Sequence, residues 1–245
     1  MEENKIFGLR PVLEALLANR PFEKIMLREG ANSELLRQII EQAKNKGITV
    51  NRVPAERLER LSKNGNHQGI VAFLSSAEYA DLETVLENIN QTGKKAFLLL
   101  LDKITDVRNF GAIVRTAECA GIDAVIVPAK NAAPMNVDAM KTSAGALNHV
   151  PICRVSSLKT ALYLIKNYDI KTVAATEKAG KNYFDADLSC PIALIVGSEE
   201  SGISKSTLEL ADEKVKIPLA GKIESLNVSA ATAVIAFECV RQSAH

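Results

Sequence analysis

Along the first 75 residues, segments whose apolar positions repeat with helical spacing alternate with segments whose pattern is typical of strands. This alternation predicts a compact α/β unit. Polar residues dominate between positions 76 and 95, where we expect a linker that contains one helix, at 82–89. Within the unit, we expect helices at 10–17, 33–46 and 55–61, and strands at 24–28, 48–53 and 69–74.

The remaining residues, 96–245, predict a second α/β unit with a mostly parallel sheet. It opens with the unbroken apolar run 97–101, which is typical of a strand covered by helices on both faces. Ligands of such sheets bind beyond the carboxyl ends of the strands, so we expect the site in the loops after Leu101, Val196 and Ile217. We expect further strands at 124–127, 152–155, 172–175, 192–196 and 214–217, and helices at 112–119, 137–144, 158–166 and 228–241.

Composition narrows the class of protein. Of 245 residues, 47% are hydrophobic and 24% are charged, which excludes disordered and fibrous proteins. The longest apolar run, 96–101, is far shorter than the roughly 18 residues that span a bilayer. The acidic start Met1-Glu2-Glu3 lacks the layout of a signal peptide. We therefore expect a cytoplasmic protein without a membrane partner.

Cysteine and histidine do not form a metal-binding pattern. The four cysteines are separated by 34, 37 and 49 positions, and the three histidines are equally scattered. We therefore expect buried thiols and chemistry that uses no metal. The residues concerned are Cys119, Cys153, Cys190 and Cys239, together with His67, His149 and His245.

The net charge of +1 argues against a general polyanion binder, but the charge is not evenly distributed. Residues 1–75 contain 12 Lys and Arg against 9 Asp and Glu, whereas the remainder contains 18 against 20. Because phosphate binding depends on local positive charge, the N-terminal unit suits a nucleic acid better than the second unit does.

Polar loops after apolar strands are the candidates for chemistry, and the first covers residues 102–117. Gly111 permits a tight entry from strand to helix, and Asn109 is placed to cap that helix. Arg115 lies six residues beyond Asn109 on the predicted helix. From spacing alone, a surface ion pair explains Arg115 as well as a role in a site does.

The second loop covers residues 197–202 and has a glycine at each end, which lets backbone N–H groups face a ligand. Its spacing is neither that of a dinucleotide-binding loop nor that of a P-loop with its Lys. The adjacent carboxylates of Glu199 and Glu200 would also repel a phosphate. A neutral or cationic ligand therefore suits this loop better.

The third loop covers residues 217–229 and carries small polar side chains before an apolar helix. These are Ser225, Asn227 and Ser229, and Asn227 is placed to cap the helix. Capping does not explain why three polar, glycine-containing loops all follow apolar strands of one sheet.

Together these loops resemble the three signature motifs of the SpoU (TrmH-like) class of SPOUT RNA 2′-O-methyltransferases. Residues 1–75, including the stretch 66–72, are similar to the substrate-binding domain of the RlmB subgroup, which has a ribosomal protein L30e-like fold. One position departs from the family pattern: Val107 follows Asp106, where the family usually has Pro. Without Pro, the φ angle at position 107 is no longer fixed, and the backbone gains an N–H group. The matching residues are Asn109, Gly111 and Arg115; Gly197, Glu199 and Gly202; and Ile217, Pro218, Ser225, Leu226, Asn227 and Ser229.

The resemblance implies that S-adenosyl-L-methionine is the cofactor and that a C-terminal SPOUT α/β trefoil-knot domain holds it. It also implies a homodimer with its active sites at the interface. A knot is a rare exception among folds, and no periodicity in a sequence predicts one. By the same resemblance, Thr176, Gly197, Ile217 and Leu226 contact the cofactor, and its positively charged sulfur suits a nearby Glu199.

The reaction so implied is in-line attack of a ribose 2′-hydroxyl oxygen on the cofactor methyl group, with the reacting atoms about 3–3.5 Å apart. The family proposal makes Arg115 the base, but a guanidinium remains protonated in proteins. We therefore expect Arg115 to orient an RNA phosphate and to stabilise the developing alkoxide. Asn109 and Ser225 are expected to orient the ribose, Asn227 to support its loop, and Glu199 to fix Arg115 or a hydroxyl.

By similarity to the RlmB subgroup, the expected substrate is a guanosine in the peptidyl-transferase region of large-subunit (23S) rRNA. One alternative is a tRNA 2′-O-methyltransferase, although such members often lack the N-terminal unit. A second is a non-catalytic RNA-binding ribosome-assembly factor, against which the intact motif residues argue. A nucleotide-dependent α/β enzyme is disfavoured because the chain has no phosphate-loop Lys.

Overall fold

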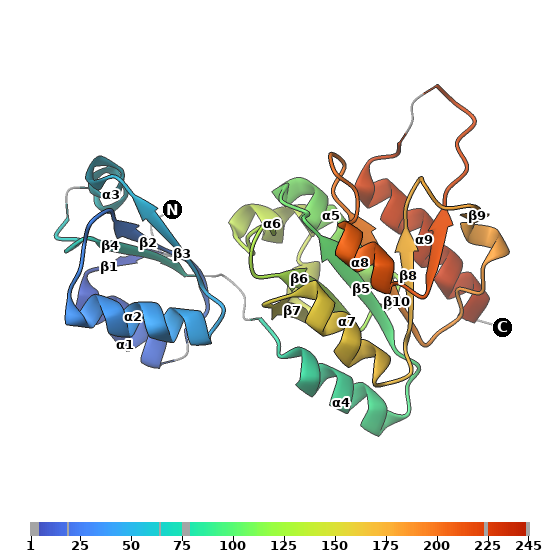
Figure 1. The fold of residues 1–245 in the computed structure, drawn as a ribbon, viewed down its shortest axis with the longest axis horizontal. Helices are drawn as coiled ribbons and strands as arrows, with labels where there is room; N and C mark the ends of the chain where they lie inside the picture. Colours follow the sequence, from blue (N-terminus) through green and yellow to red (C-terminus); the bar gives the residue numbers. More distant parts are fainter. Residues whose placement is uncertain (1–4, 19, 64, 75–78, 223–224, 244–245) are drawn as a thin grey trace. The chain divides into compact units, whose positions relative to one another are not determined.

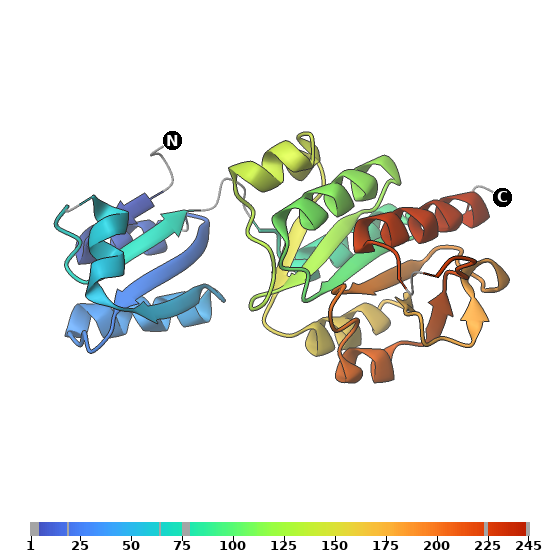
Figure 2. The same cartoon turned by 90° about the horizontal axis from the view of Figure 1, so that it is seen from above.

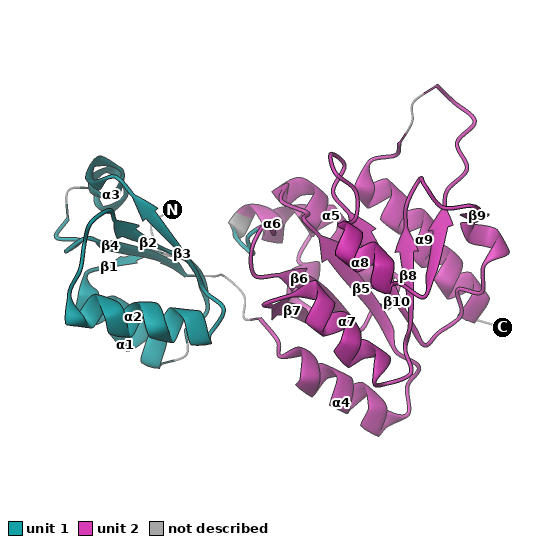
Figure 3. Ribbon diagram, in the orientation of Figure 1, with its two compact units in different colours: residues 1–78, 134–136 teal, residues 79–133, 137–245 magenta. Residues whose placement is uncertain are grey.

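The computed structural model describes residues 5–18, 20–63, 65–74, 79–222 and 225–243. Four stretches considered above lie outside the described residues: the acidic start at 1–4, the beginning of the expected linker at 75–78, positions 223–224 of the third loop, and His245. The chain divides into two compact units, residues 1–78 with 134–136 and residues 79–133 with 137–245 (Figure 3).

Unit 1 is an α/β unit with a mixed sheet, whose described strands have the order β1-β4-β2-β3. β2 and β3 are parallel, whereas β4 is antiparallel to both β1 and β2. Side chains alternate along β2, so that Ile25 and Leu27 pack with α1 and α2 while Met26 packs with α3. The elements are β1 (Lys5–Phe7), α1 (Leu9–Leu17), β2 (Phe22–Arg28), α2 (Glu34–Asn45), β3 (Thr49–Val53), α3 (Ala55–Ser62) and β4 (Ile70–Leu74).

Unit 2 contains a sheet of seven strands among its described residues, in the order β7-β6-β5-β10-β8-β11-β9. All neighbouring strands are parallel, which confirms the predicted α/β class with a mostly parallel sheet. Helices α5 and α9 cover one face, and α4, α7 and α8 cover the other (Figures 1 and 2). The elements are α4 (Leu82–Thr92), β5 (Phe97–Asp102), α5 (Val107–Cys119), β6 (Ala124–Pro128), α6 (Val137–Thr142), β7 (Ile152–Val155), α7 (Leu158–Lys166), β8 (Lys171–Ala175), β9 (Lys181–Asn182), β10 (Ile192–Gly197), α8 (Lys205–Leu210), β11 (Glu213–Lys216) and α9 (Val228–Ser243), with 3-10 turns η1 (Ala146–Asn148) and η2 (Tyr183–Asp185).

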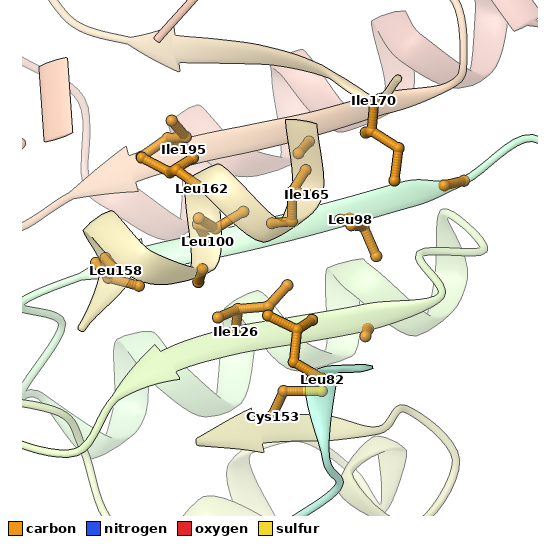
Figure 4. Packing of buried hydrophobic residues seen from close by; sticks show 14 of the residues in the cluster. Leu82, Leu98, Leu100, Ile126, Cys153, Leu158, Leu162, Ile165, Ile170 and Ile195 are labelled. Atoms are coloured by element: carbon orange, nitrogen blue, oxygen red, sulfur yellow. The ribbon is translucent and has the colours of Figure 1, made fainter. Parts of the chain in front are cut away.

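Helix α4 lies in the segment that we expected to be a linker. In the structure, unit 2 begins at Tyr79, so α4 belongs to unit 2. Its buried side chains Leu82 and Leu86 join the apolar cluster that α7 and the sheet form around Leu100 and Ile126 (Figure 4). Only these few positions of α4 face the core, and most other residues of the segment are polar. The sequence pattern therefore did not indicate that α4 packs against the sheet.

The elements present in the structure correspond closely to the expected ones, and the missed elements are short. These are β1, β9, α8 and the two 3-10 turns, which offer too few residues for a periodic pattern. Helix α5 begins at Val107, five residues before the expected start. No helix in the described part of the chain has both the length and the apolar character needed to cross a membrane.

The cysteines differ in exposure, contrary to the prediction of four buried thiols. Cys153 and Cys239 are buried, and burial raises the pKa of each thiol to about 12. Cys119 is exposed at the end of α5, and Cys190 is half-buried. The apolar character of the cysteine side chain was therefore not enough to predict which cysteines are buried.

Candidate functional site

The carboxyl ends of β5, β10, β8 and β11 meet at one edge of the unit 2 sheet. β10 lies between β5 and β8, and its last residue Gly197 pairs with Asp102, the last residue of β5. The chain builds outward from β5 through β6 and β7 on one side, and β8 and β10 lie on the other. The strand order therefore reverses beside β5, which is where ligands of open parallel sheets bind.

A cavity of about 330 Å³ opens at this edge, which is within the usual size range of small-molecule sites. The loops after β8, β10 and β11 and the first turns of α9 form its walls. Asn109, Arg115 and Asn227 are not among the described residues that line it. Six predicted site residues do line it: Thr176, Gly197, Glu199, Ile217, Ser225 and Leu226.

Several lining residues were not identified from the sequence. Glu177 and Lys178 follow Thr176 after β8, and Leu219 follows β11. Their positions directly after predicted strands were the available signal, because the loops after parallel strands share one edge. Leu219 and Leu226 are 41% and 40% exposed, so the cavity rim presents apolar side chains to solvent.

A hydrogen-bonded network connects Asn109, Glu199 and Asn227, which come from three separate segments. The Glu199 carboxylate accepts hydrogen bonds from the Asn109 amide at 3.2 Å, from the Asn227 amide, and from the Val228 backbone N–H at 3.1 Å. The Asn227 amide also donates to the Asn109 side-chain oxygen at 2.9 Å. The network therefore ties the first turn of α5 to the loop after β10 and to the start of α9.

Asn227 caps α9, as the sequence predicted. Its side-chain oxygen accepts the backbone N–H groups of Ser229 at 3.0 Å and Ala230 at 3.4 Å, together with the Ser229 hydroxyl. One side chain therefore both starts α9 and joins the network around Glu199.

Asp106 caps α5, which corrects the assignment of that role to Asn109. The Asp106 carboxylate accepts the backbone N–H groups of Arg108 and Asn109, each at 2.8 Å. Val107 is consequently the first helical residue, a position whose N–H has no partner within any helix. The usual Pro would fit there, and Val107 costs the helix little, while Asn109 in the first turn can reach Glu199.

Gly111 lies inside α5, so it does not serve the tight strand-to-helix entry that we expected. A Cβ at this position would lie 2.6 Å from Thr142 Cβ and 3.0 Å from the Ser143 nitrogen. The missing side chain therefore lets α6 pack closely against α5.

The loop after β10 folds back on itself, and this explains its two glycines. A Cβ on Gly197 would lie 2.2 Å from the carbonyl carbon of Gly202, which itself has a φ of +63°. The Ser198 carbonyl accepts the Gly202 N–H at 2.8 Å, and the Ser198 hydroxyl accepts the Ser201 N–H at 3.1 Å. This closed turn places Glu199 toward the network.

Arg115 is exposed on α5, and its side chain makes no hydrogen bond or ion pair with any residue that the structure describes. Glu199 therefore does not fix Arg115, contrary to one of our two expectations for this carboxylate; its partners are amides and a backbone N–H. The surface ion pair that spacing also allowed is absent for Arg115 within the described chain. Its guanidinium is left available to a partner outside the chain.

Comparison with family models identifies both units. Residues 96–237 match the model of the SpoU rRNA Methylase family. Residues 5–80 match the model described as RNA 2′-O ribose methyltransferase substrate binding.

Individual relatives cover nearly the whole chain. YacO of Bacillus subtilis, named for the TrmH family of tRNA/rRNA methyltransferases, is 32% identical over 241 residues, which are 98% of this chain and 96% of YacO. The crystal structure of the SpoU methyltransferase AviRb from Streptomyces viridochromogenes with AdoMet has a TM-score of 0.61 at 25% identity, covering 97% of this chain and 89% of AviRb. A crystal structure of an RNA 2′-O ribose methyltransferase has a TM-score of 0.56 at 27% identity, covering 97% and 88%.

Proposed function

The chain belongs to the SpoU rRNA methylase family, and from that premise we propose that it transfers a methyl group from S-adenosylmethionine to the 2′-hydroxyl of a guanosine in large-subunit (23S) rRNA. The class of reaction, RNA 2′-O-ribose methylation, follows from the family. The observation that carries the assignment is that the second and third motif loops line the cavity and that hydrogen bonds to Glu199 join the first motif loop to them.

The cavity fits this cofactor in its chemistry. Ile217 and Leu226 offer apolar surface to an adenine ring, and the backbone beside them and at Gly197 offers hydrogen-bonding groups. Thr176 adds a hydroxyl at the end of β8. Glu199 in the wall suits a positively charged sulfur, whereas it would oppose a phosphate. We therefore assign Thr176, Gly197, Ile217 and Leu226 to cofactor binding.

When bound, the cofactor supplies an electrophilic methyl group on a cationic sulfur. The protein must hold the ribose so that its 2′-oxygen approaches in line. We assign Arg115 to binding an RNA phosphate and to stabilising negative charge that develops on the 2′-oxygen. No histidine occurs in the three loops, and we propose water or a phosphate oxygen as the acceptor of the hydroxyl proton.

We propose roles for the other polar side chains of the three motif loops from their hydrogen bonds. Ser225 lines the cavity, and we assign it to orienting the ribose. Asn109 is assigned to the same task through the second hydrogen of its side-chain amide, since only the first donates to Glu199. Glu199 and Asn227 hold Asn109 in place and keep the loop after β10 against α9. We therefore assign Glu199 and Asn227 to positioning, within the catalytic set named from the motifs.

We also propose a homodimer, as the resemblance implies. Val234 and Phe237 are 37% and 47% exposed and lie three residues apart on α9, so they form one apolar strip that a second copy would cover. An active site at such an interface would accommodate Arg115, which lies outside the cavity of its own chain.

Unit 1 is assigned to selecting the RNA. Residues 5–74 contain twelve Lys and Arg against seven Asp and Glu, and this unit has its own apolar clusters. Its presence favours rRNA over tRNA as the substrate, and we propose a cytoplasmic location for the protein. Removal of residues 1–75 should weaken RNA binding and leave cofactor binding in place; unchanged RNA affinity would contradict this assignment.

The proposed substrate is tested by transfer of labelled methyl from S-adenosylmethionine to 23S rRNA transcribed in vitro and, in parallel, to unmodified tRNA. We expect 2′-O-methylguanosine in rRNA alone. Product in tRNA alone would support 2′-O-methylation as the reaction and would show that tRNA, not rRNA, is the substrate. Cofactor binding without product on either RNA would favour the non-catalytic assembly factor.

A further inference from the structure

Several lysines at the amino edge of the unit 2 sheet form ion pairs with carboxylates of other elements. Four ion pairs at this edge join different elements, and each includes a residue at the start of a strand or in the segment leading into one. Glu213 bonds two lysines at once, with N–O distances of 2.8 and 2.6 Å. These pairs are Lys94–Asp123, Lys166–Asp212, Lys171–Glu213 and Lys181–Glu213.

Four cations near the carboxyl edge of the same sheet have no such partner. Lys103 directly follows β5, and Lys130 follows β6. Arg108 is the second residue of α5, and Lys141 lies at the end of α6. All four are exposed, and none of their side chains makes a hydrogen bond or an ion pair with a described residue.

The segments that carry these cations are held together. The Ala133 N–H donates to the Ile104 carbonyl at 2.7 Å, which joins the loops after β5 and β6. Helices α5 and α6 lie side by side and meet closely at Gly111 (Figures 1 and 2). Arg108 is one turn before Gly111, so it shares the side of α5 that faces α6. The four cations therefore belong to one connected surface.

This surface reaches the residues around the cavity. Lys103 follows Asp102, whose carboxylate accepts the Ser204 N–H at 2.8 Å just beyond the loop after β10. Arg108 precedes Asn109, which bonds Glu199. The two cations are thus directly adjacent in sequence to groups that hold the cavity loop.

Backbone conformation adds an independent feature at the same edge. Lys103 has a φ of +60° and Asn131 a φ of +58°, in the left-handed region. Asn adopts this region with some frequency, but Lys does so rarely. Such conformations are retained where the surrounding structure enforces them, often at functional loops.

We propose that Lys103, Arg108, Lys130 and Lys141 form a phosphate-binding track that positions the RNA strand beside the cavity. The inference rests on the proposed function and names where unit 2 itself contacts its substrate. Unpaired cations on a rigid surface match the regular charge of an RNA backbone, and they bind it without reading sequence. They act by positioning and do not take part in the chemical step.

The test compares full-length wild-type protein with the double variant Lys103→Gln/Lys130→Gln. Lys95→Gln is the control, because Lys95 is exposed and forms no ion pair with a described residue, but precedes β5 at the amino edge. For each protein we would measure the affinity for 23S rRNA over a range of salt concentrations, the affinity for S-adenosylmethionine, and KM and kcat for methyl transfer.

The double variant should show about a tenfold higher KM for RNA, with kcat and cofactor affinity near wild type. Its slope of log affinity against log salt should be smaller by about 1.4, since each lost single-strand phosphate contact removes about 0.7. If the wild type is active but the double variant shows no such change, or Lys95→Gln shows an equal change, the phosphate-binding track is wrong and the proposed function still stands. A wild type that neither binds nor methylates RNA would overturn the proposed function and the track with it.

Discussion

The Glu199 carboxylate accepts a hydrogen bond from the Asn109 side-chain amide at 3.2 Å, across 90 positions of the sequence. Asn227 donates to the same carboxylate oxygen. A single side chain therefore fixes the relative positions of α5, the loop after β10 and α9. This relationship links all three motif loops, two of which line the cavity, through one carboxylate.

Glu199→Ala should reduce both stability and turnover. The substitution leaves the Asn109 amide and the Val228 N–H without their acceptor and removes one of the two acceptors of the Asn227 amide, which should lower the free energy of unfolding by about 1–2 kcal/mol. Loss of the ordered loop should lower kcat about a hundredfold. Denaturant unfolding and methyl-transfer rates measure both effects. The control is Glu118→Ala on the exposed side of α5; equal behaviour of the two variants would contradict the role of Glu199.

Arg115→Ala should abolish methyl transfer to within detection, by a factor of at least about 100, while cofactor affinity stays nearly intact. The free energy of unfolding should change by less than about 0.5 kcal/mol, because Arg115 is exposed and has no partner among the described residues. Arg115→Lys should restore little activity, since a lysine lacks the planar fork that binds phosphate. Near-normal turnover on RNA in the alanine variant would show that the assigned role is wrong.

Gly197→Ala should destabilise the protein by about 3 kcal/mol and weaken cofactor binding. The new Cβ would meet the backbone of Gly202 at 2.2 Å, so the loop that forms the cavity wall must move. Gly180→Ala is the matched control, because a Cβ there meets nothing within 4 Å. Calorimetric unfolding and cofactor titration provide the measurements, and a Gly197→Ala variant as stable as Gly180→Ala would contradict the observed turn.

Glu213 should make stability depend on pH in the acidic range. Hydrogen bonds from Lys171 and Lys181 lower the pKa of its carboxyl below the ordinary value. A lowered folded-state pKa means that the stabilisation is complete above the unfolded pKa, about 4.3, and is lost as the pH falls through the folded value. Glu213→Gln should therefore be less stable than wild type by about 1 kcal/mol at pH 7, and the gap should narrow below about pH 4. A gap that widens in acid would contradict this sign.

Much of unit 2 could be predicted because its strands are long and apolar. The run 97–101 identified β5, and strands alternating with amphipathic helices identified the parallel sheet and the edge at which the cavity opens. Asn227 was recognised as a cap because a cap and the helix that it starts are neighbours in sequence. Local signals of this kind need only a few adjacent residues.

The contacts of the site could not be predicted from spacing. Asn109 and Asn227 are 118 positions apart, and only the strand order β5-β10-β8 brings their segments together. The capping role was assigned to Asn109, but Asp106, three residues earlier, is an equally good capping residue and takes that role in the structure. Gly111 was misassigned because its neighbour is a residue of α6, which no local pattern reveals. The knot that the resemblance implies stays a prediction.

The most direct measurement of the central claim is alkaline hydrolysis of 23S rRNA after incubation with the wild-type protein and labelled S-adenosylmethionine. Alkali cleaves RNA through the free 2′-hydroxyl, so a methyl group on that oxygen protects the adjacent linkage. The account predicts that the label appears in an alkali-resistant dinucleotide that contains guanosine, and that Arg115→Ala gives none. Label recovered only in mononucleotides would place the methyl group on a base and would contradict ribose 2′-O-methylation by this site.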